Sequence, residues 1–264
     1  MVVASMKNFS SILLSIGIFL VSQSGNQALA QDAEWKEIRI ATEGAYPPFN
    51  FVDAAGKLQG LDVDIAMALC EEMKAKCTVV AQDWDGIIPG LLARKFDAIV
   101  ASMSITQERL KVIDFSKKYY SSKLSILTKA DSQLADIKPE SFEGKTIGAQ
   151  SSTPQAEYAQ EIYGKHGATV KLYPSQTEAD MDLSNGRLDA IVADKFYLAA
   201  WMESTGAGCC KLLGDLAEGR TEIGVGLRKE DVALKEKFDA AMEAIIANGV
   251  YKKTVARYFN FDIY

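Results

Sequence analysis

Short runs of β-branched residues alternate with helical patterns along most of this chain, and this alternation restricts its fold more than any other feature. Glu37–Thr42 predicts a strand, Leu61–Met73 an amphipathic helix, and Thr78–Ala81 a second strand. Strands that alternate with helices of this length indicate βαβ units and a mainly parallel sheet. Further helices are predicted over Gly86–Arg94, Gln155–Tyr163, Thr177–Asn185, Asp231–Asn248 and Gly249–Tyr258, and further strands over Ala98–Val100, Lys145–Ala149, Val170–Tyr173 and Ala190–Val192.

An internal sequence repeat suggests that the chain contains two similar sets of alternating strands and helices. The pentapeptide Asp-Ala-Ile-Val-Ala occurs at 97–101 and again at 189–193, each time after a helical pattern that ends in a basic residue. Matching context around identical residues indicates two similarly built lobes. Tyr119–Lys129 and Glu222–Leu227 are predicted as extended segments that cross between them.

We therefore expect an α/β fold with two Rossmann-like lobes joined by two hinge strands. The first lobe is expected to contain residues 31–121 and 222–264, and the second residues 122–221. Ligands in open α/β sheets bind beyond the carboxyl ends of the strands, so two facing lobes create a cleft for a ligand.

Residues 1–30 have the pattern of a cleaved signal peptide. Lys7 supplies an early positive charge, Ile12–Val21 is apolar, and Ala28-Leu29-Ala30 is a small-residue cleavage site. A membrane anchor is the alternative, but the apolar run is about half the ~20 residues that a span requires. Export to the periplasm is expected.

Composition and charge limit the classes of partner. The formal net charge is −6, and no block of basic residues occurs. Nucleic acid is therefore not an expected partner. The chain has a single histidine, His166, in a loop pattern, and no nucleophile–base pair or metal-ligand cluster can be recognised. We expect no cofactor and no metal, and a monomeric protein.

Four cysteines follow the predicted signal. Cys70 and Cys77 flank six residues at the end of a predicted helix. In an exported protein this spacing favours a disulfide over two free thiols. Cys209 and Cys210 are adjacent, and they receive no role, because bridging neighbours requires a strained ring and a metal would need more ligands than His166 provides.

Several motifs occur together in the order found in a known family. The chain from about Ile38 onward resembles the periplasmic polar-amino-acid binding proteins, above all the lysine/arginine/ornithine, arginine, histidine and opine receptors. The resemblance implies the type II periplasmic binding protein fold and a receptor that delivers its ligand to a membrane ABC permease. The motifs are ATEGAYPPF (41–49), GLDVDI (60–65), WDGIIPGL (84–91), SMSITQER (102–109), DFS (114–116), GRLDA (186–190) and GVGLRK (224–229).

A site for an amino acid must pair an α-carboxylate and an α-ammonium, because lobe closure removes water. Arg109 is the expected carboxylate partner, since a guanidinium offers two parallel donors, and by resemblance it occupies the family's arginine position. The alternative is a surface arginine in a helix. Asp194, at a strand end, suits the ammonium group, or else caps a helix from Lys195. Thr153 could cap the next helix and donate to the carboxylate.

Two acids and two aromatic residues are expected to select the ligand's side chain. Glu43 and Asp62 near one pocket favour a cation between them. Tyr46 and Trp84 could sandwich a guanidinium. Core packing for Trp84 and helix capping for Asp62 remain alternatives. Arginine is the first choice of ligand, followed by ornithine, lysine, histidine or an opine.

The complete set of predicted ligand-binding residues combines these groups with the motif residues beside them. The set is Glu43, Tyr46, Asp62, Trp84, Ser102, Met103, Ser104, Arg109, Thr153, Gln155 and Asp194.

Pro154 departs from the family pattern. Relatives often have a hydroxyl residue at this position, whereas proline has no backbone N–H to donate.

Two other functions share this chemistry. A few dehydratases share the fold, but an enzyme would need a general acid or base in the pocket, and His166 lies in a predicted turn. A receptor that signals to a membrane sensor would bind the same ligands. We expect a binding protein and no catalytic residues.

Overall fold

Strands that are almost inaccessible to solvent form the centre of two five-stranded sheets. The computed structural model describes residues 1–2, 35–217 and 220–264, and Trp35–Tyr264 forms one compact unit. Apart from its first two residues, the predicted signal peptide lies outside the described residues. In the described part of the chain, no helix has the length and apolar character needed to cross a membrane.

The first sheet and its helices make up the first lobe. Strand β1 lies between β5 and β6 and runs parallel to both, whereas β13 is antiparallel to β6 and β7. The sheet order is β5 (Lys76–Ala81), β1 (Glu37–Thr42), β6 (Ala98–Ile99), β13 (Thr221–Leu227) and β7 (Asp114–Ser122). The helices are α2 (Leu61–Glu72), η1 (Trp84–Gly86), α3 (Ile87–Leu92), α4 (Gln107–Val112), α8 (Val232–Ala247) and α9 (Val250–Val255).

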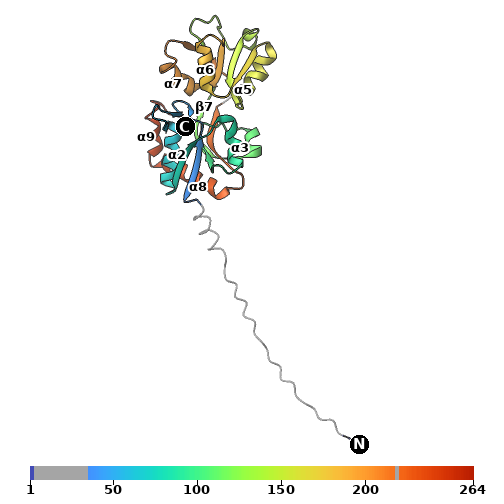
Figure 1. Ribbon diagram of the computed structural model, residues 1–264, viewed down its shortest axis with the longest axis vertical. Coiled ribbons are helices and arrows are strands. Elements are labelled where there is room, and N and C mark those ends of the chain that lie inside the picture. Colours follow the sequence, from blue (N-terminus) through green and yellow to red (C-terminus); the bar gives the residue numbers. More distant parts are fainter. Residues whose placement is uncertain (3–34, 218–219) are drawn as a thin grey trace. The chain divides into compact units, whose positions relative to one another are not determined.

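The second sheet and its helices make up the second lobe, in which β9 is parallel to β10 and β11, and β8 is antiparallel to β11 and β12. Figure 1 shows α5, α6 and α7 around this sheet. The sheet order is β10 (Thr169–Tyr173), β9 (Thr146–Gln150), β11 (Ala190–Asp194), β8 (Leu124–Lys129) and β12 (Cys210–Asp215). The helices are α5 (Pro154–Tyr158), α6 (Gln176–Ser184), α7 (Lys195–Glu203) and the short η2 (Pro139–Phe142), η3 (Ala159–Tyr163) and η4 (Gly164–His166).

The chain crosses between the lobes twice. The first crossing is at Lys123, between β7 and β8, and the second lies between β12 and β13. The predicted α/β fold with two lobes and two hinge strands is therefore confirmed. A small third sheet, β2 (Ala45–Tyr46), β3 (Asn50–Val52) and β4 (Leu58–Gln59), was not predicted, because strands of two or three residues show no recognisable periodicity.

The repeated pentapeptide occupies the same place in both lobes. The Asp97 carboxylate accepts a hydrogen bond from the backbone N–H of Arg39 in β1, and the Asp189 carboxylate accepts one from Thr146 in β9. In return the backbone N–H of each aspartate donates to the carbonyl of the same partner, at 2.8 Å in both lobes. The aspartate therefore ties the start of a central strand to its parallel neighbour, which gives the repeat a structural reason.

The predicted disulfide between Cys70 and Cys77 is present and links the end of α2 to β5. The structure also joins Cys209 to Cys210 at the start of β12. The first bridge closes a loop with a sequence separation of seven residues, so it restricts the unfolded chain.

Replacement of both Cys70 and Cys77 by serine is expected to lower the free energy of unfolding by about 2–3 kcal/mol, because the loop-closure entropy is lost. Urea denaturation followed by circular dichroism measures the change. The matched control is the double variant Cys209→Ser and Cys210→Ser, which opens a bridge without intervening residues and should cost less. Equal losses in the two variants would show that loop length does not determine the stabilisation.

Candidate functional site

The carboxyl ends of parallel strands from the two lobes supply the walls of one cavity. Glu43 follows β1, Ser102 follows β6, and Gln150 is the last residue of β9. The cavity is narrow, about 20 Å³, which is room for about one water molecule. Residues from both lobes line it: Glu43, Tyr46, Trp84, Ala101, Ser102, Ser104, Arg109, Gln150, Thr153, Pro154 and Gln155. An amino acid is much larger than one water, so its admission requires the walls to separate.

Arg109 is buried in this cavity wall, with 8% of its surface exposed, which excludes the alternative of a surface arginine. The hydroxyl of Thr106 caps α4 by accepting a hydrogen bond from the backbone N–H of Arg109. The side chain of Arg109 lines the cavity. Its guanidinium donates to the carbonyls of Ser104 (2.8 Å) and Ser152 (3.0 Å).

No carboxylate among the described residues forms an ion pair with Arg109. Loss of water around the buried guanidinium lowers the pKa of Arg109 to about 10, still far above neutral pH, so the group stays charged. The charge of the Glu157 carboxylate raises this pKa against the effect of burial, but Glu157 does not form an ion pair with Arg109. A buried cation without a directly bonded counter-ion is costly unless an anion reaches it. The arrangement is therefore suited to bind an anionic group in the cavity.

Glu43 also lines the cavity, with 9% of its surface exposed, and accepts a hydrogen bond of 2.6 Å from the side-chain amide of Gln150 in the second lobe. Burial is the main cause that raises the pKa of the Glu43 carboxyl to about 7, and the charges of Asp62, Asp83 and Asp85 raise it further, while the Gln150 bond lowers it. This carboxyl consequently changes its charge near neutral pH, and a nearby cation would favour its ionised form.

Asp62 lies behind the cavity wall and not in it. Its carboxylate accepts hydrogen bonds from Tyr119 (2.7 Å), Asn50 (2.7 Å) and Ser102 (2.9 Å), and it is fully buried. Burial raises the pKa of Asp62 to about 6 against the effect of these donors. Gly60 is the N-cap of α2, so Asp62 does not cap the helix. It acts on the cavity through the Ser102 hydroxyl and through its charge.

Asp194 caps α7. Its carboxylate accepts hydrogen bonds from the backbone N–H groups of Phe196 (2.8 Å) and Tyr197 (3.2 Å), which is the capping role considered as an alternative from the sequence. Burial raises the pKa of Asp194 to about 6, although a hydrogen bond with Ser122 lowers it. Asp194 is buried at the end of β11 but is not among the residues that line the narrow cavity.

The two aromatic residues of the predicted site have partners within the protein. The ring of Tyr46 stacks on that of Tyr197 in the second lobe, with centroids 4.0 Å apart and an interplanar angle of 16°. The guanidinium of Arg109 lies over the Trp84 ring, 5.3 Å from its centroid, and the indole N–H of Trp84 donates to the Ser152 carbonyl at 3.4 Å. Both rings thus join the lobes across the cleft.

The remaining predicted residues differ in their access to the cavity. Thr153 caps α5 and also donates to the Gln150 carbonyl at 2.6 Å. Gln155 and Ser104 line the cavity beside it. Met103 is fully buried in an apolar cluster with Trp84, so it supports the wall from behind.

Two residues with evident roles were not predicted. Gln150 binds Glu43 across the cleft, and the rule that ligands meet strand ends could have found it, because it ends β9. Ser152 contributes its backbone carbonyl to Arg109 and Trp84. A carbonyl oxygen is present in every residue, so no sequence signal marks this one.

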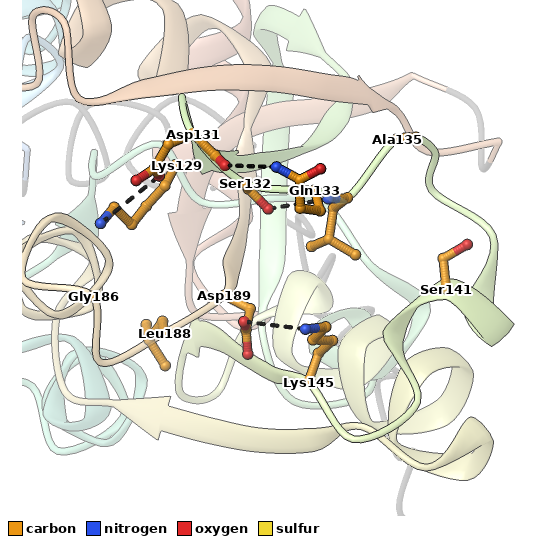
Figure 2. A pocket seen from close by; sticks show the side chains of 11 residues that line it. Lys129, Asp131, Ser132, Gln133, Ala135, Ser141, Lys145, Gly186, Leu188 and Asp189 are labelled. Atoms are coloured by element: carbon orange, nitrogen blue, oxygen red, sulfur yellow. Dashed lines mark hydrogen bonds and ion pairs between the residues drawn. The ribbon is translucent and has the colours of Figure 1, made fainter.

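A larger cavity of about 490 Å³ lies in the second lobe, at the amino ends of β9 and β11 (Figure 2). Figure 2 shows its charged side chains in pairs: Lys129 with Asp131 at 3.9 Å, and Lys145 with Asp189 at 3.8 Å. These charges compensate one another, and all the lining residues belong to the second lobe. The narrow cavity, with its unpaired guanidinium, is therefore the stronger candidate.

Most of the sequence is similar to that of known proteins. Residues 38–261 match the family described as bacterial extracellular solute-binding proteins, family 3. A Pseudomonas aeruginosa protein named L-arginine-binding protein is 43% identical over 234 residues, which cover 87% of this chain and 90% of the relative.

Two solved structures show the same fold. An ancestral arginine-binding protein bound to arginine has a TM-score of 0.80 and 32% identity, over 85% of this chain and 99% of that one. An ancestral amino acid-binding protein, described as a precursor of cyclohexadienyl dehydratase, has a TM-score of 0.78 and 28% identity, over 88% and 99% of the two chains.

Proposed function

Because the chain belongs to family 3 of the bacterial extracellular solute-binding proteins, we propose that it binds a basic amino acid, with L-arginine as the first choice, between its lobes. The observation that carries the proposal is the buried guanidinium of Arg109, which, among the residues that the structure describes, hydrogen-bonds to two carbonyl oxygens, lies over an aromatic face and forms no ion pair. An α-carboxylate would supply the missing counter-charge through two parallel hydrogen bonds.

The acids around the cavity support a cationic side chain in the ligand. Glu43, Asp62 and Asp194 are all buried, and burial raises the pKa of each toward the range of 6 to 7. A cation between such groups relieves their mutual repulsion and restores their ionised forms. In the proposal, Asp194, which does not line the narrow cavity, receives the α-ammonium group once the ligand has separated the walls. The charges of Glu43 and Asp62 favour the guanidinium end.

The other proposed ligand-binding residues shape the cavity and hold its charged groups. Tyr46 and Trp84 cover the aliphatic part of the ligand once the lobes separate enough to admit it. A narrow cavity with contacts from both sides implies that binding and release require the lobes to move. The supporting residues are Ser102, Met103, Ser104, Thr153 and Gln155.

Delivery to a membrane ABC permease follows from the family, and we propose that this is the role of the ligand complex. Export through a cleaved signal at residues 1–30 and residence in the periplasm are part of the proposal. The lobes are proposed to comprise residues 31–121 with 222–264, and residues 122–221.

Thermal denaturation in the presence of single amino acids tests the function. L-arginine, and to a smaller extent ornithine and lysine, should raise the melting temperature, since a ligand that binds the folded state stabilises it. Calorimetric titration then gives the affinities. Stabilisation by acidic amino acids but not by arginine would contradict the proposed ligand class.

We propose that the protein binds its ligand without converting it. The likeness to a dehydratase precursor favours an enzyme as the second candidate, and Glu43, with a pKa of about 7, would be its general base. The single histidine is exposed in η4, away from the cavity lining. Proton NMR of L-arginine and of cyclohexadienyl acids incubated with the protein distinguishes the two functions, since only an enzyme would produce new resonances.

Affinity for L-arginine is expected to rise with pH between about pH 6 and pH 8. The Glu43 carboxyl has a pKa of about 7 in the protein, and a bound cation lowers this pKa, so binding releases a proton and is weakened below pH 7. The change should reach up to about tenfold. Asp62 and Asp194, with pKa values of about 6, deepen the loss at lower pH.

Calorimetric titration at a series of pH values measures this dependence, with Glu43→Gln as the matched variant. The variant should bind more weakly at pH 8 and show a flatter profile between pH 6 and pH 8. An equally steep profile in the variant would assign the titration to another group.

A further inference from the structure

A carboxylate at the rim of the cleft binds two serines of the opposite lobe. Asp85, in η1 of the first lobe, accepts hydrogen bonds from the hydroxyls of Ser151 (2.9 Å) and Ser152 (2.8 Å), which lie between β9 and α5 of the second lobe. Neither Asp85 nor the serines line the narrow cavity. These bonds therefore join the lobes outside the narrow cavity, beside a second cavity of about 200 Å³ that Asp85 and Ser152 line together with Arg109.

The same loop is held at a second point by its backbone. The carbonyl of Ser152 accepts hydrogen bonds from Arg109 and from the indole N–H of Trp84, which directly precedes Asp85 in the chain. Ser152 has a φ of 56°, in the left-handed region that non-glycine residues seldom adopt. The hydroxyl of Ser152 thus binds Asp85 and its carbonyl binds Arg109 and Trp84, all of which belong to the first lobe.

The loop leads directly into the second-lobe wall of the cavity. Thr153, Pro154 and Gln155 follow Ser152 and line the cavity. A restraint on Ser151 and Ser152 therefore also fixes the wall that faces Arg109. Separation of the lobes breaks the Asp85 bonds and frees this wall together with the guanidinium.

We propose that Asp85 is a positioning residue that latches the closed state through Ser151 and Ser152 and thereby slows release of the ligand without touching it. The proposal rests on the function proposed above. Interactions present only in the closed state affect the rate of opening and not the encounter with the ligand. The dissociation rate constant should thus depend on Asp85, and the association rate constant should not.

The kinetic test compares Asp85→Ala with wild type by stopped-flow tryptophan fluorescence during binding of L-arginine and displacement by a competitor. Dissociation should accelerate about three- to thirtyfold, as for loss of hydrogen bonds to a charged group near solvent. The matched control is Asp83→Ala: Asp83 lies two residues earlier and, like Asp85, raises the pKa of Glu43 through its charge. The control should keep the wild-type dissociation rate.

A double-mutant cycle separates a latch from a general charge effect. Asp85→Ala and the pair Ser151→Ala with Ser152→Ala should each accelerate dissociation, and all three changes together should add little to either one. Additive effects, or equal rates in Asp85→Ala and Asp83→Ala, would overturn the latch while leaving the proposed ligand site intact.

Small-angle scattering tests the latch without relying on affinity. The radius of gyration of Asp85→Ala should exceed that of wild type and of Asp83→Ala at saturating L-arginine, because fewer molecules remain closed. If wild type binds none of the amino acids, the proposed function fails, and the same comparison is made without ligand. Identical radii in all three proteins would overturn the latch in either case.

Discussion

Replacement of Arg109 by alanine is expected to weaken the binding of L-arginine by about 2–5 kcal/mol, the range for removing one partner of a buried charge pair. The guanidinium is the buried cation of the cavity wall, and its contacts with the carbonyls of Ser104 and Ser152 leave donors for a carboxylate. Calorimetric titration at pH 8 measures the loss.

Agmatine, which is arginine without its α-carboxylate, provides the internal control for this prediction. Wild type and Arg109→Ala should bind agmatine with similar, weak affinity, because the lost interaction concerns the missing group. Arg94→Ala is the matched control variant, since Arg94 is exposed and pairs with Glu230 on the surface. Binding of L-arginine by Arg109→Ala as tightly as by wild type would remove Arg109 from the site.

Replacement of Arg228 by alanine is expected to lower the free energy of unfolding by about 3–5 kcal/mol. Arg228 is 2% exposed, and its guanidinium lies 3.4 Å from Asp97 and 2.6 Å from Asp231. It also donates to the carbonyls of Leu91 and Phe96, so its loss leaves two carboxylates and two carbonyls without this partner. Urea denaturation of the purified variant gives the change.

Arg39→Ala is the matched control for Arg228. Arg39 pairs with the same Asp97 at 2.9 Å, but its side chain is half exposed, and its backbone N–H would keep binding Asp97 after the substitution. Exposed pairs of this kind contribute about 0–1 kcal/mol. Equal losses in both variants would show that burial does not set the contribution of these pairs.

The layout of the strands could be predicted because the β-branched residues of the central strands are buried. Ile38, Ile40, Ile191 and Val192 belong to short β-branched runs, which a helix rarely matches. The repeated pentapeptide pointed to two lobes, and its aspartates now have equivalent hydrogen bonds in each. The two crossing segments, Tyr119–Lys129 and Glu222–Leu227, were predicted only to be extended, and the antiparallel pairing of β7 with β13 was not predicted.

The site could be predicted as a set of residue types but not as a geometry. The sequence placed Asp62 and Asp194 near strand ends or helix starts, yet it could not tell that Asp62 would turn toward Tyr119 and Asn50, behind the wall. Arg228 lies in the motif GVGLRK, but no role for it could be predicted from the sequence. Burial of a charged side chain depends on partners far away in the sequence, here Asp97. Long-range partners are fixed by tertiary packing and leave no local pattern.

A crystal structure of the protein with L-arginine is the most direct measurement for this account. The α-carboxylate should lie within hydrogen-bond distance of the Arg109 guanidinium, with the ligand's basic end on the side of Glu43. A complex in which the carboxylate faces solvent or another residue, while the Arg109 guanidinium still hydrogen-bonds to the carbonyls of Ser104 and Ser152 and not to the ligand, would contradict the central claim.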